Sequence, residues 1–242
     1  MATLLLRLAA PMQAWGVDSK FETRQSLREP SKSGVIGMLA AALGCPRNQL
    51  PEKLLDLRMA VRVDQEGRLL TDFHTAHGIA ADGMGRILRE ADGSPKKAKN
   101  RDFITYRQYL NDAVFVVALE HEDAGWLYEL AEALRAPVYP LFLGRRSCPP
   151  TLPLVLDVMP QTRTDALRTY PWQAAEPYRR QHSSDKLRVV SDADAGSAAR
   201  PGRRDVPVSF DPGWRRYALR AVEHSVVAPC GSNEHDPMRE LE

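Results

Sequence analysis

One apolar helix and the segment that leads into it constrain the fold of this chain more than any other stretch. Residues 23–44 read TRQSLREPSKSGVIGMLAAALG, so a basic, polar segment runs into Pro30 and an apolar run follows. The apolar positions recur at helical spacing and also fill the other faces, which predicts a helix buried on nearly all sides. Ser31 or Ser33 can cap its first turn, and Gly44 can supply the left-handed residue that ends it.

The start of this predicted helix is a candidate phosphate site. A helix N-terminus collects unpaired N–H donors and the positive end of the helix dipole. Lys32 and Arg24 add positive charge beside it, and the hydroxyl of Ser33 adds a donor. The alternative is a well-capped core helix with a solvated lysine, and this stretch alone favours that alternative.

Composition limits the classes of function. The chain has 242 residues, 33 of them basic and 31 acidic, for a formal net charge of +2. It is therefore no polycation, and a nucleic-acid surface must come from local clustering. The three cysteines are far apart with no CxxC pair, so we expect no disulfide framework, metal site or cofactor. No apolar run reaches the length of a membrane span, so we expect no membrane partner and a cytoplasmic location.

The order of predicted elements indicates an α+β fold. Strands alternate with two helices, and the second helix has Asp123 as a plausible N-cap and one apolar face. This order matches a ferredoxin-like βαββαβ unit, a sheet of the kind that often binds single-stranded RNA. The expected strands are residues 3–9, 57–64, 69–74, 112–120 and 154–158, and the expected helices begin near residues 31 and 123.

A long insertion interrupts this order. Residues 75–108 show little apolar periodicity and carry a basic run, and a stretch of that kind inside a compact domain is usually functional or disordered. Tyr106 and Arg107 lie where aromatic and basic residues interleave, which suits base stacking combined with phosphate contact. A mobile, solvated loop is an equally good interpretation.

Two further loops carry candidate RNA contacts. Arg145 and Arg146 follow a glycine between apolar residues and prolines, an arrangement suited to gripping a phosphate. Gln13 and Trp15 lie in the loop PMQAWG, where an indole could stack on a base and an amide could hydrogen-bond one. For a single tryptophan, a place in the core is the favoured alternative.

Four segments together resemble a known family. LLLRLAAPMQAWG, TRQSLREPSKSGVIGMLAAALG, RQYLNDAVFVVAL and YPLFLGRRSCPP occur in this order, and the set resembles the CasD subunits of type I-E CRISPR Cascade complexes over most of the chain to about residue 160. The resemblance implies a ferredoxin-like (RRM/RAMP) fold with a long β-hairpin thumb and a smaller β-rich C-terminal domain. It also implies a non-catalytic RNA-binding subunit, used in antiviral defence.

Carried onto this chain, the resemblance implies the following organisation. The RAMP domain would comprise residues 1–74 and 109–160, the thumb 75–108, and the C-terminal domain and tail 161–242. The partners would be the 5′ handle of the crRNA, the Cascade backbone subunit, the large PAM-reading subunit and, indirectly, target DNA. The residues expected to bind RNA are Gln13, Trp15, Arg24, Lys32, Ser33, Tyr106, Arg107, Arg145 and Arg146.

Three other functions are open to this sequence. A metal-independent endoribonuclease for CRISPR repeats, such as a related type I-C subunit, could use His74 or His77 as the base, with Lys96, Lys97 and Lys99 steadying the phosphate. The spacing of the two histidines matches no known dyad. A nucleotide enzyme built on Ser31-Lys32-Ser33 lacks the GxxxxGK[ST] order. A purely structural subunit would join proteins without binding RNA.

Overall fold

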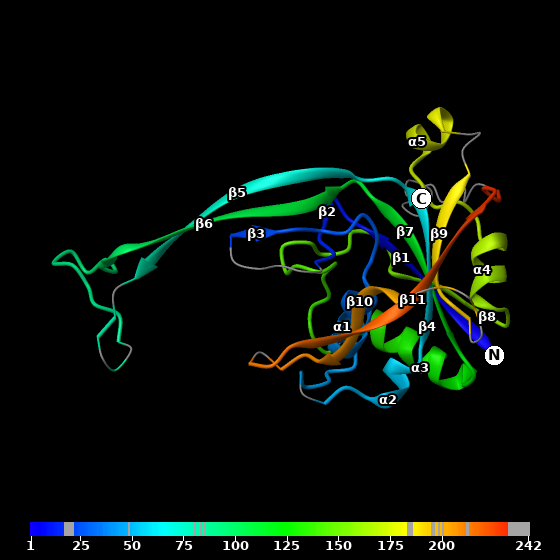
Figure 1. The fold of residues 1–242 in the computed structure, drawn as a ribbon, viewed down its shortest axis with the longest axis horizontal. Coiled ribbons are helices and arrows are strands. Elements are labelled where there is room, and N and C mark those ends of the chain that lie inside the picture. Colours follow the sequence, from blue (N-terminus) through cyan, green and yellow to red (C-terminus); the bar gives the residue numbers. More distant parts are fainter. Residues whose placement is uncertain are drawn as a thin grey trace, which may run out of the picture.

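A seven-stranded antiparallel sheet forms the centre of the computed structural model (Figure 1), with the strand order β10-β11-β9-β4-β7-β1-β8. The model describes residues 1–16, 22–47, 49–79, 81–82, 84, 86–182, 186–194, 197, 199, 201–211 and 213–231. The strands are β1 (Ala2–Ala9), β4 (Arg58–Gln65), β7 (Val114–His121), β8 (Val155–Met159), β9 (Leu187–Asp192), β10 (Pro201–Ser209) and β11 (Arg216–Val227).

Helices cover both faces of the sheet. The alternation of β1 decides which face each side chain meets, since successive strand residues point to opposite sides. Leu4, Leu6 and Leu8 pack with α1 (Lys32–Ala42) and α3 (Ala124–Arg135) in the main core. Leu5 points the other way, toward α4 (Arg163–Thr169). Two short helices, α2 (Glu52–Leu55) and α5 (Glu176–Gln181), lie in the connections.

The two long helices begin and end as their sequences predict. The Ser31 hydroxyl accepts from the backbone N–H of Gly34, and Gly44 adopts a φ of 74° just past the end of α1. At α3, the Asp123 carboxylate accepts from the N–H of Trp126. Each cap satisfies a backbone group that the helix leaves free, so the helix ends are set locally.

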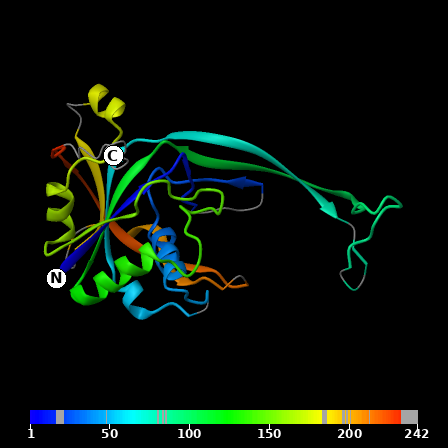
Figure 2. The ribbon, with the colours of Figure 1, turned by 180° about the vertical axis from the view of Figure 1, so that it is seen from behind.

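A long two-stranded hairpin projects from the sheet (Figures 1 and 2). It consists of β5 (Arg68–Ile79) and β6 (Lys97–Asn111), so it starts before the insertion predicted at residue 75 and includes the short strand expected at 69–74. Two short strands, β2 (Met12–Gln13) and β3 (Thr23–Arg24), pair with β6 at its base. The hairpin has little apolar periodicity because most of it packs on no core of its own.

The C-terminal segment joins the same sheet. Residues 161–242 were expected to form a separate small domain, but β9 pairs with β4, and β11 pairs with β9. Without β9, the edge of β4 would present unpaired backbone groups, and the C-terminal strands satisfy them. In the described part of this segment, α4 and α5 are followed by β9, β10 and β11, which continue the central sheet.

A buried ionic cluster locks this segment to α1. The ammonium of Lys32 lies 2.8 Å from a carboxylate oxygen of Asp192, and the N–H of Lys32 donates to Asp205 at 2.9 Å. Arg220 donates to Asp205 at 2.6 and 3.0 Å and also pairs with Asp192. Two cations and two carboxylates therefore compensate one another in a largely buried site, which makes the removal of any one member costly.

We predict that Asp205→Ala lowers the free energy of unfolding by about 3–5 kcal/mol, because Arg220 and Lys32 would then share the single carboxylate of Asp192 and one buried positive charge would be uncompensated. The matched control is Asp165→Ala. Asp165 pairs with Arg168 on the surface, and such a pair contributes about 0–1 kcal/mol. Urea unfolding of both variants would measure the difference, and equal losses would contradict the prediction.

A pH dependence follows from Asp192. Burial alone would raise its pKa, but Lys32 and Arg220 outweigh burial and hold the pKa below its usual value. The folded state therefore binds this proton less readily than the unfolded state, whose pKa is about 3.9. The resulting stability is present above pH ~4 and is lost as pH falls through the folded pKa. We expect the unfolding free energy of Asp192→Asn to fall less steeply in acid than that of the wild type. Parallel slopes in urea titrations at successive pH values would contradict this.

Candidate nucleic-acid interface

The loop at residues 144–147, here called the glycine-arginine loop, packs against the backbone that follows β1. Gly144 has a φ of +87°, and a Cβ built there would lie 1.6 Å from the carbonyl oxygen of Ala14. The N–H of Ala14 donates to the carbonyl of Leu143 at 3.1 Å. Only glycine permits this approach, so the loop presents Arg145 and Arg146 at a fixed place.

Arg145 ties three segments together. Its guanidinium donates to the backbone carbonyls of Gln108 at 3.1 Å and Arg24 at 3.2 Å, and its Cζ lies 4.5 Å from the centre of the buried Tyr109 ring. The loop is thereby fastened to β6 and β3 at the base of the long hairpin. Its donors are partly used by backbone, so Arg145 is a positioning residue as well as a source of charge.

Arg24 and Arg107 are brought side by side by strand pairing. β3 runs parallel to β6, with Thr23 opposite Tyr106 and Arg24 opposite Arg107. The N–H of Tyr106 donates to the carbonyl of Glu22 at 2.8 Å. Arg24 is exposed and Arg107 is half-buried.

These side chains define the hairpin-base cluster: Arg24, Tyr106, Arg107, Arg145 and Arg146. In the part of the chain that the model describes, no carboxylate forms an ion pair with any of its four arginines. Asp72 of β5 lies opposite Arg107 of β6 in the strand register, but the two side chains form no ion pair. Four positive charges from three distant segments thus gather at one place with their charge uncompensated by ion pairs.

The two faces of the hairpin differ in chemistry. The register places Phe73 opposite Tyr106, and their rings meet edge to face with centres 5.6 Å apart. Phe73 is 57% exposed and Tyr106 is 45% exposed. Leu69 and Ile104 share this face by alternation and are also exposed. The sequence analysis missed Phe73. Leu69 and Phe73 are four positions apart, so they lie on the same face of a strand, and this spacing was a signal for such a face.

Gln13 and Trp15 are buried, which contradicts their assignment as RNA contacts. The Gln13 amide donates to the carbonyls of Leu8 and Ala113, and its oxygen accepts from the Trp15 indole. Trp15 is 1% exposed, so it cannot stack on a base in this conformation. Both residues flank Ala14, which contacts Gly144, so they support the loop that carries Arg145 and Arg146.

Lys32 is also unavailable to a phosphate, and the start of α1 already holds an anion. The protein's own Asp205 carboxylate accepts from the N–H of Lys32, and Asp192 pairs with its ammonium. Ser33 is half-buried beside them. The phosphate site expected from this sequence is therefore filled by carboxylates of the C-terminal segment, which lie 160 and 173 residues away along the chain.

The candidate nuclease residues are spread along the hairpin. His74 lies opposite Thr105, whereas Lys97 lies opposite Ile79, five residues further along β5 and roughly 17 Å away. The side chains of His77 and Lys99 lie outside the described residues. In the described ranges, no group of three or more His, Cys, Asp or Glu side chains is placed to hold a metal ion.

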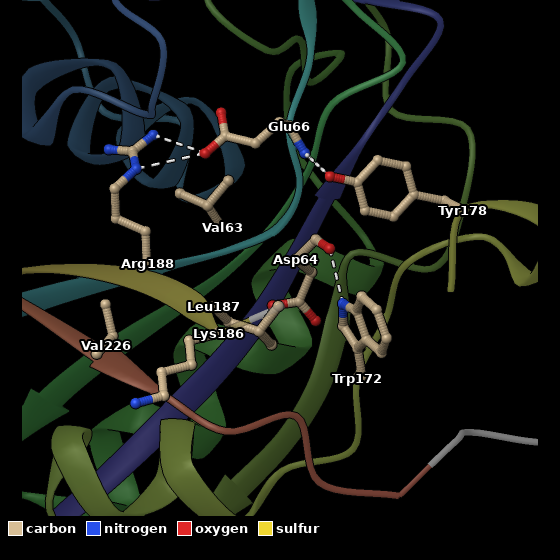
Figure 3. Close-up of a pocket in the computed structure, with 9 residues that line it drawn as sticks. All are labelled: Val63, Asp64, Glu66, Trp172, Tyr178, Lys186, Leu187, Arg188 and Val226. Atoms are coloured by element: carbon tan, nitrogen blue, oxygen red, sulfur yellow. Dashed lines mark hydrogen bonds and ion pairs between the residues drawn. The ribbon is translucent and has the colours of Figure 1, made fainter. Parts of the chain in front are cut away.

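A separate hollow of about 320 Å³ lies between the end of β4, the start of β9 and α5 (Figure 3). Arg188 pairs there with Glu66 at 3.2 Å, and the hydroxyl of Tyr178 accepts from the N–H of Glu66. The Trp172 indole donates to the carbonyl of Asp64 at 2.7 Å. These polar groups satisfy one another, and none of the expected RNA-binding residues lines the hollow.

Known proteins are similar to this chain in sequence and in fold. A family model described as CRISPR-associated protein (Cas_Cas5) matches residues 3–223. The CRISPR system Cascade subunit CasD of Escherichia coli (strain K12) is 38% identical over 166 residues, which are 63% of this chain and 69% of that protein. The resemblance noted from the sequence is thereby confirmed.

Two solved structures agree. A chain of a CRISPR RNA-guided surveillance complex is 33% identical, with a TM-score of 0.72 over 99% of this chain and 97% of that chain. A structure titled as that of a Cas protein is 32% identical, with a TM-score of 0.69 over 96% of this chain and 100% of that chain. This is an α/β protein of the CRISPR-associated class. The chain belongs to the Cas5 family.

Within the described residues, the helices are too short or too polar to cross a membrane.

We predict that Arg145→Ala lowers the free energy of unfolding by about 1–3 kcal/mol, because it removes two hydrogen bonds and a cation–π contact. Arg146→Ala is the control, since Arg146 is exposed and its side chain makes no such contact with the described residues. This variant should change stability by less than about 0.5 kcal/mol. Urea unfolding compares them. Equal stability of both variants would show that Arg145 does not fasten the loop.

Proposed function

We propose that this protein is a non-catalytic RNA-binding subunit of a type I-E Cascade complex and that its hairpin-base cluster holds the 5′ handle of the crRNA. The observation that carries the proposal is the gathering of Arg24, Arg107, Arg145 and Arg146 without carboxylate partners in the described chain. Uncompensated arginines of this kind suit phosphate oxygens. Family membership and the likeness to a chain of an RNA-guided complex support it.

The mode of binding follows from the chemistry of the cluster. Arginines on phosphates give affinity that falls with salt and carries little sequence information. Specificity must come from bases that splay out and stack, and the exposed Tyr106 ring beside Phe73 provides such a surface. We assign the phosphate contacts to Arg24, Arg107 and Arg146, and positioning to Arg145.

The fold supports a RAMP architecture. Within the sheet, the order β8-β1-β7-β4 and the intervening helices correspond to a ferredoxin-like βαββαβ unit, with the β5–β6 hairpin as its thumb. The exposed apolar side chains nearer the tip of the hairpin, such as Ile79 and Ile87, suit a protein neighbour, whereas the hairpin base with Tyr106 and Arg107 suits RNA. We infer that the neighbours are the backbone subunit and the large PAM-reading subunit, which bring the protein near target DNA.

Cleavage of repeat RNA is the alternative function, and the geometry of the described residues does not favour it. Acid–base cleavage needs a base and a cation at one phosphate, whereas His74 on β5 and Lys97 on β6 are widely separated along the hairpin. Incubation of the protein with repeat RNA in EDTA tests this directly. Site-specific cutting would overturn the non-catalytic assignment.

The main test is the RNA affinity of an Arg24→Ala/Arg107→Ala variant. We expect weaker binding to a handle oligonucleotide, and a slope of log K against log salt that is reduced by about 0.7 for each lost phosphate contact. Arg135→Ala is the control, because Arg135 is an exposed arginine at the end of α3. Fluorescence anisotropy with a labelled handle RNA measures both quantities.

The same variants should be compared in the assembled complex. The protein would be co-expressed with its genomic neighbours and a CRISPR array, and the co-purified RNA would be sequenced. We expect RNA with a uniform 5′ end from the wild type and from Arg135→Ala, and its loss from the double variant. An unchanged salt slope together with unchanged RNA recovery would contradict the proposed site.

A further inference from the structure

A second hairpin projects from the molecule and plays no part in the proposed handle site. It is formed by β10 and β11, and it extends on the side of α1 toward the same end of the molecule as the long hairpin (Figures 1 and 2). Its tip carries the sequence GWRR at residues 213–216. An aromatic residue followed by two arginines was a signal that the sequence analysis did not use.

The tip has a defined shape. The N–H of Trp214 donates to the carbonyl of Asp211 at 3.1 Å, and the N–H of Gly213 donates to the Asp211 carboxylate at 2.7 Å. The N–H of Asp211 in turn donates to the Ser209 hydroxyl at 3.1 Å. Asp211 is therefore engaged in shaping the turn, so its charge is directed at the backbone of the tip.

The hairpin is anchored at both ends. Phe210 packs against the main core and lies against Gly37 of α1. Further down, the buried Arg220–Asp205 pair joins the hairpin to Lys32. A side chain at the tip is thus held on a rigid support, which reduces the entropy lost when it binds a partner.

Trp214 is open on this support. It is 61% exposed, whereas Trp15, Trp126 and Trp172 are each at most 9% exposed. The guanidinium of Arg216 lies 3.3 Å from the centre of the Trp214 ring and covers one of its faces. Because the residue is 61% exposed although Arg216 covers one face of the ring, we infer that the second face is available for a planar group.

The surroundings of the indole are positive. Arg215 and Arg216 are exposed beside Trp214, and Arg204 is exposed further down β10, opposite Leu219. No ion pair to these three arginines occurs in the part of the chain that the structure describes. Of the acidic residues of the hairpin, Asp205 binds Arg220 and Lys32, and Asp211 binds the backbone of the turn. Glu223 lies at the other end of β11, where it accepts from the Ser197 hydroxyl. An exposed aromatic face with uncompensated arginines is the combination that binds single-stranded nucleic acid without sequence preference.

We propose that the β10–β11 hairpin tip is a second nucleic-acid site, at which Trp214 stacks on an unpaired base and Arg215 contacts a flanking phosphate. Arg216 backs the indole and adds charge on its far face. Both single-stranded RNA and single-stranded DNA present the required base and phosphate. The site is independent of the handle site, because it uses other residues on another element.

Intrinsic fluorescence of the full chain tests this site selectively, because Trp214 is the exposed one of the four tryptophans. The probes are oligo(U) and oligo(dT) of about 12 nucleotides, in the size range of such sites. We expect saturable quenching of the exposed emission, and the two probes show whether RNA or DNA is preferred. Quenching should persist in Arg24→Ala/Arg107→Ala, which disables the handle site, so that failure of one proposal is distinguishable from failure of the other.

Affinity measured by anisotropy of a labelled probe, in the Arg24→Ala/Arg107→Ala background, gives the second readout. We expect Trp214→Ala to bind about tenfold more weakly and Trp214→Phe to retain most of the affinity, because stacking needs only an aromatic face. Arg215→Gln should reduce the salt slope by about 0.7. Absence of quenching by either probe would overturn the proposal. So would unchanged probe affinity in Trp214→Ala, and if that variant also failed to enter the assembled complex, the tip would be identified as a protein contact.

Discussion

The packing of Trp15 is the contact on which the rest of this structure depends. Its indole donates to Gln13, and its backbone pairs with Ser26 and Leu27. Its ring fills the space beside Gly34, where a Cβ would lie 2.9 Å from the ring carbons. Through its side chain and its backbone, Trp15 thereby joins the segment after β1, the segment before α1 and α1 itself. The glycine-arginine loop packs on the adjacent Ala14.

In this structure, the residues that support the proposed sites are different from the residues that are proposed to contact nucleic acid. The buried polar groups next to the candidate site are paired within the protein: Gln13 with backbone carbonyls, and Lys32 with Asp192. Several arginines that have no carboxylate partner in the described chain lie outward, at the hairpin base and at the tip of the β10–β11 hairpin. The near-neutral chain can therefore present locally positive surfaces, because the acidic residues are used to neutralise the buried cations.

Much of the fold could be predicted from local patterns. The caps of α1 and α3 and the strands β1, β4 and β7 were expected within a few residues, because hydrophobic periodicity and capping are short-range properties. The length of the hairpin and the place of residues 187–227 in the central sheet were not predicted. Both depend on which strand edge is free, and pairing between distant segments leaves no local signal.

For the candidate site, the sequence by itself determined which local features are present. These are a capped apolar helix, a glycine at a place of close backbone approach, and arginines in three separate segments. Only the tertiary structure decided which of them face outward. Lys32 and Arg24 look alike in sequence, yet one is buried against Asp192 and the other is exposed beside Arg107. The difference arises because a carboxylate 160 residues away reaches Lys32, and the position of that partner is set by strand pairing across the whole chain.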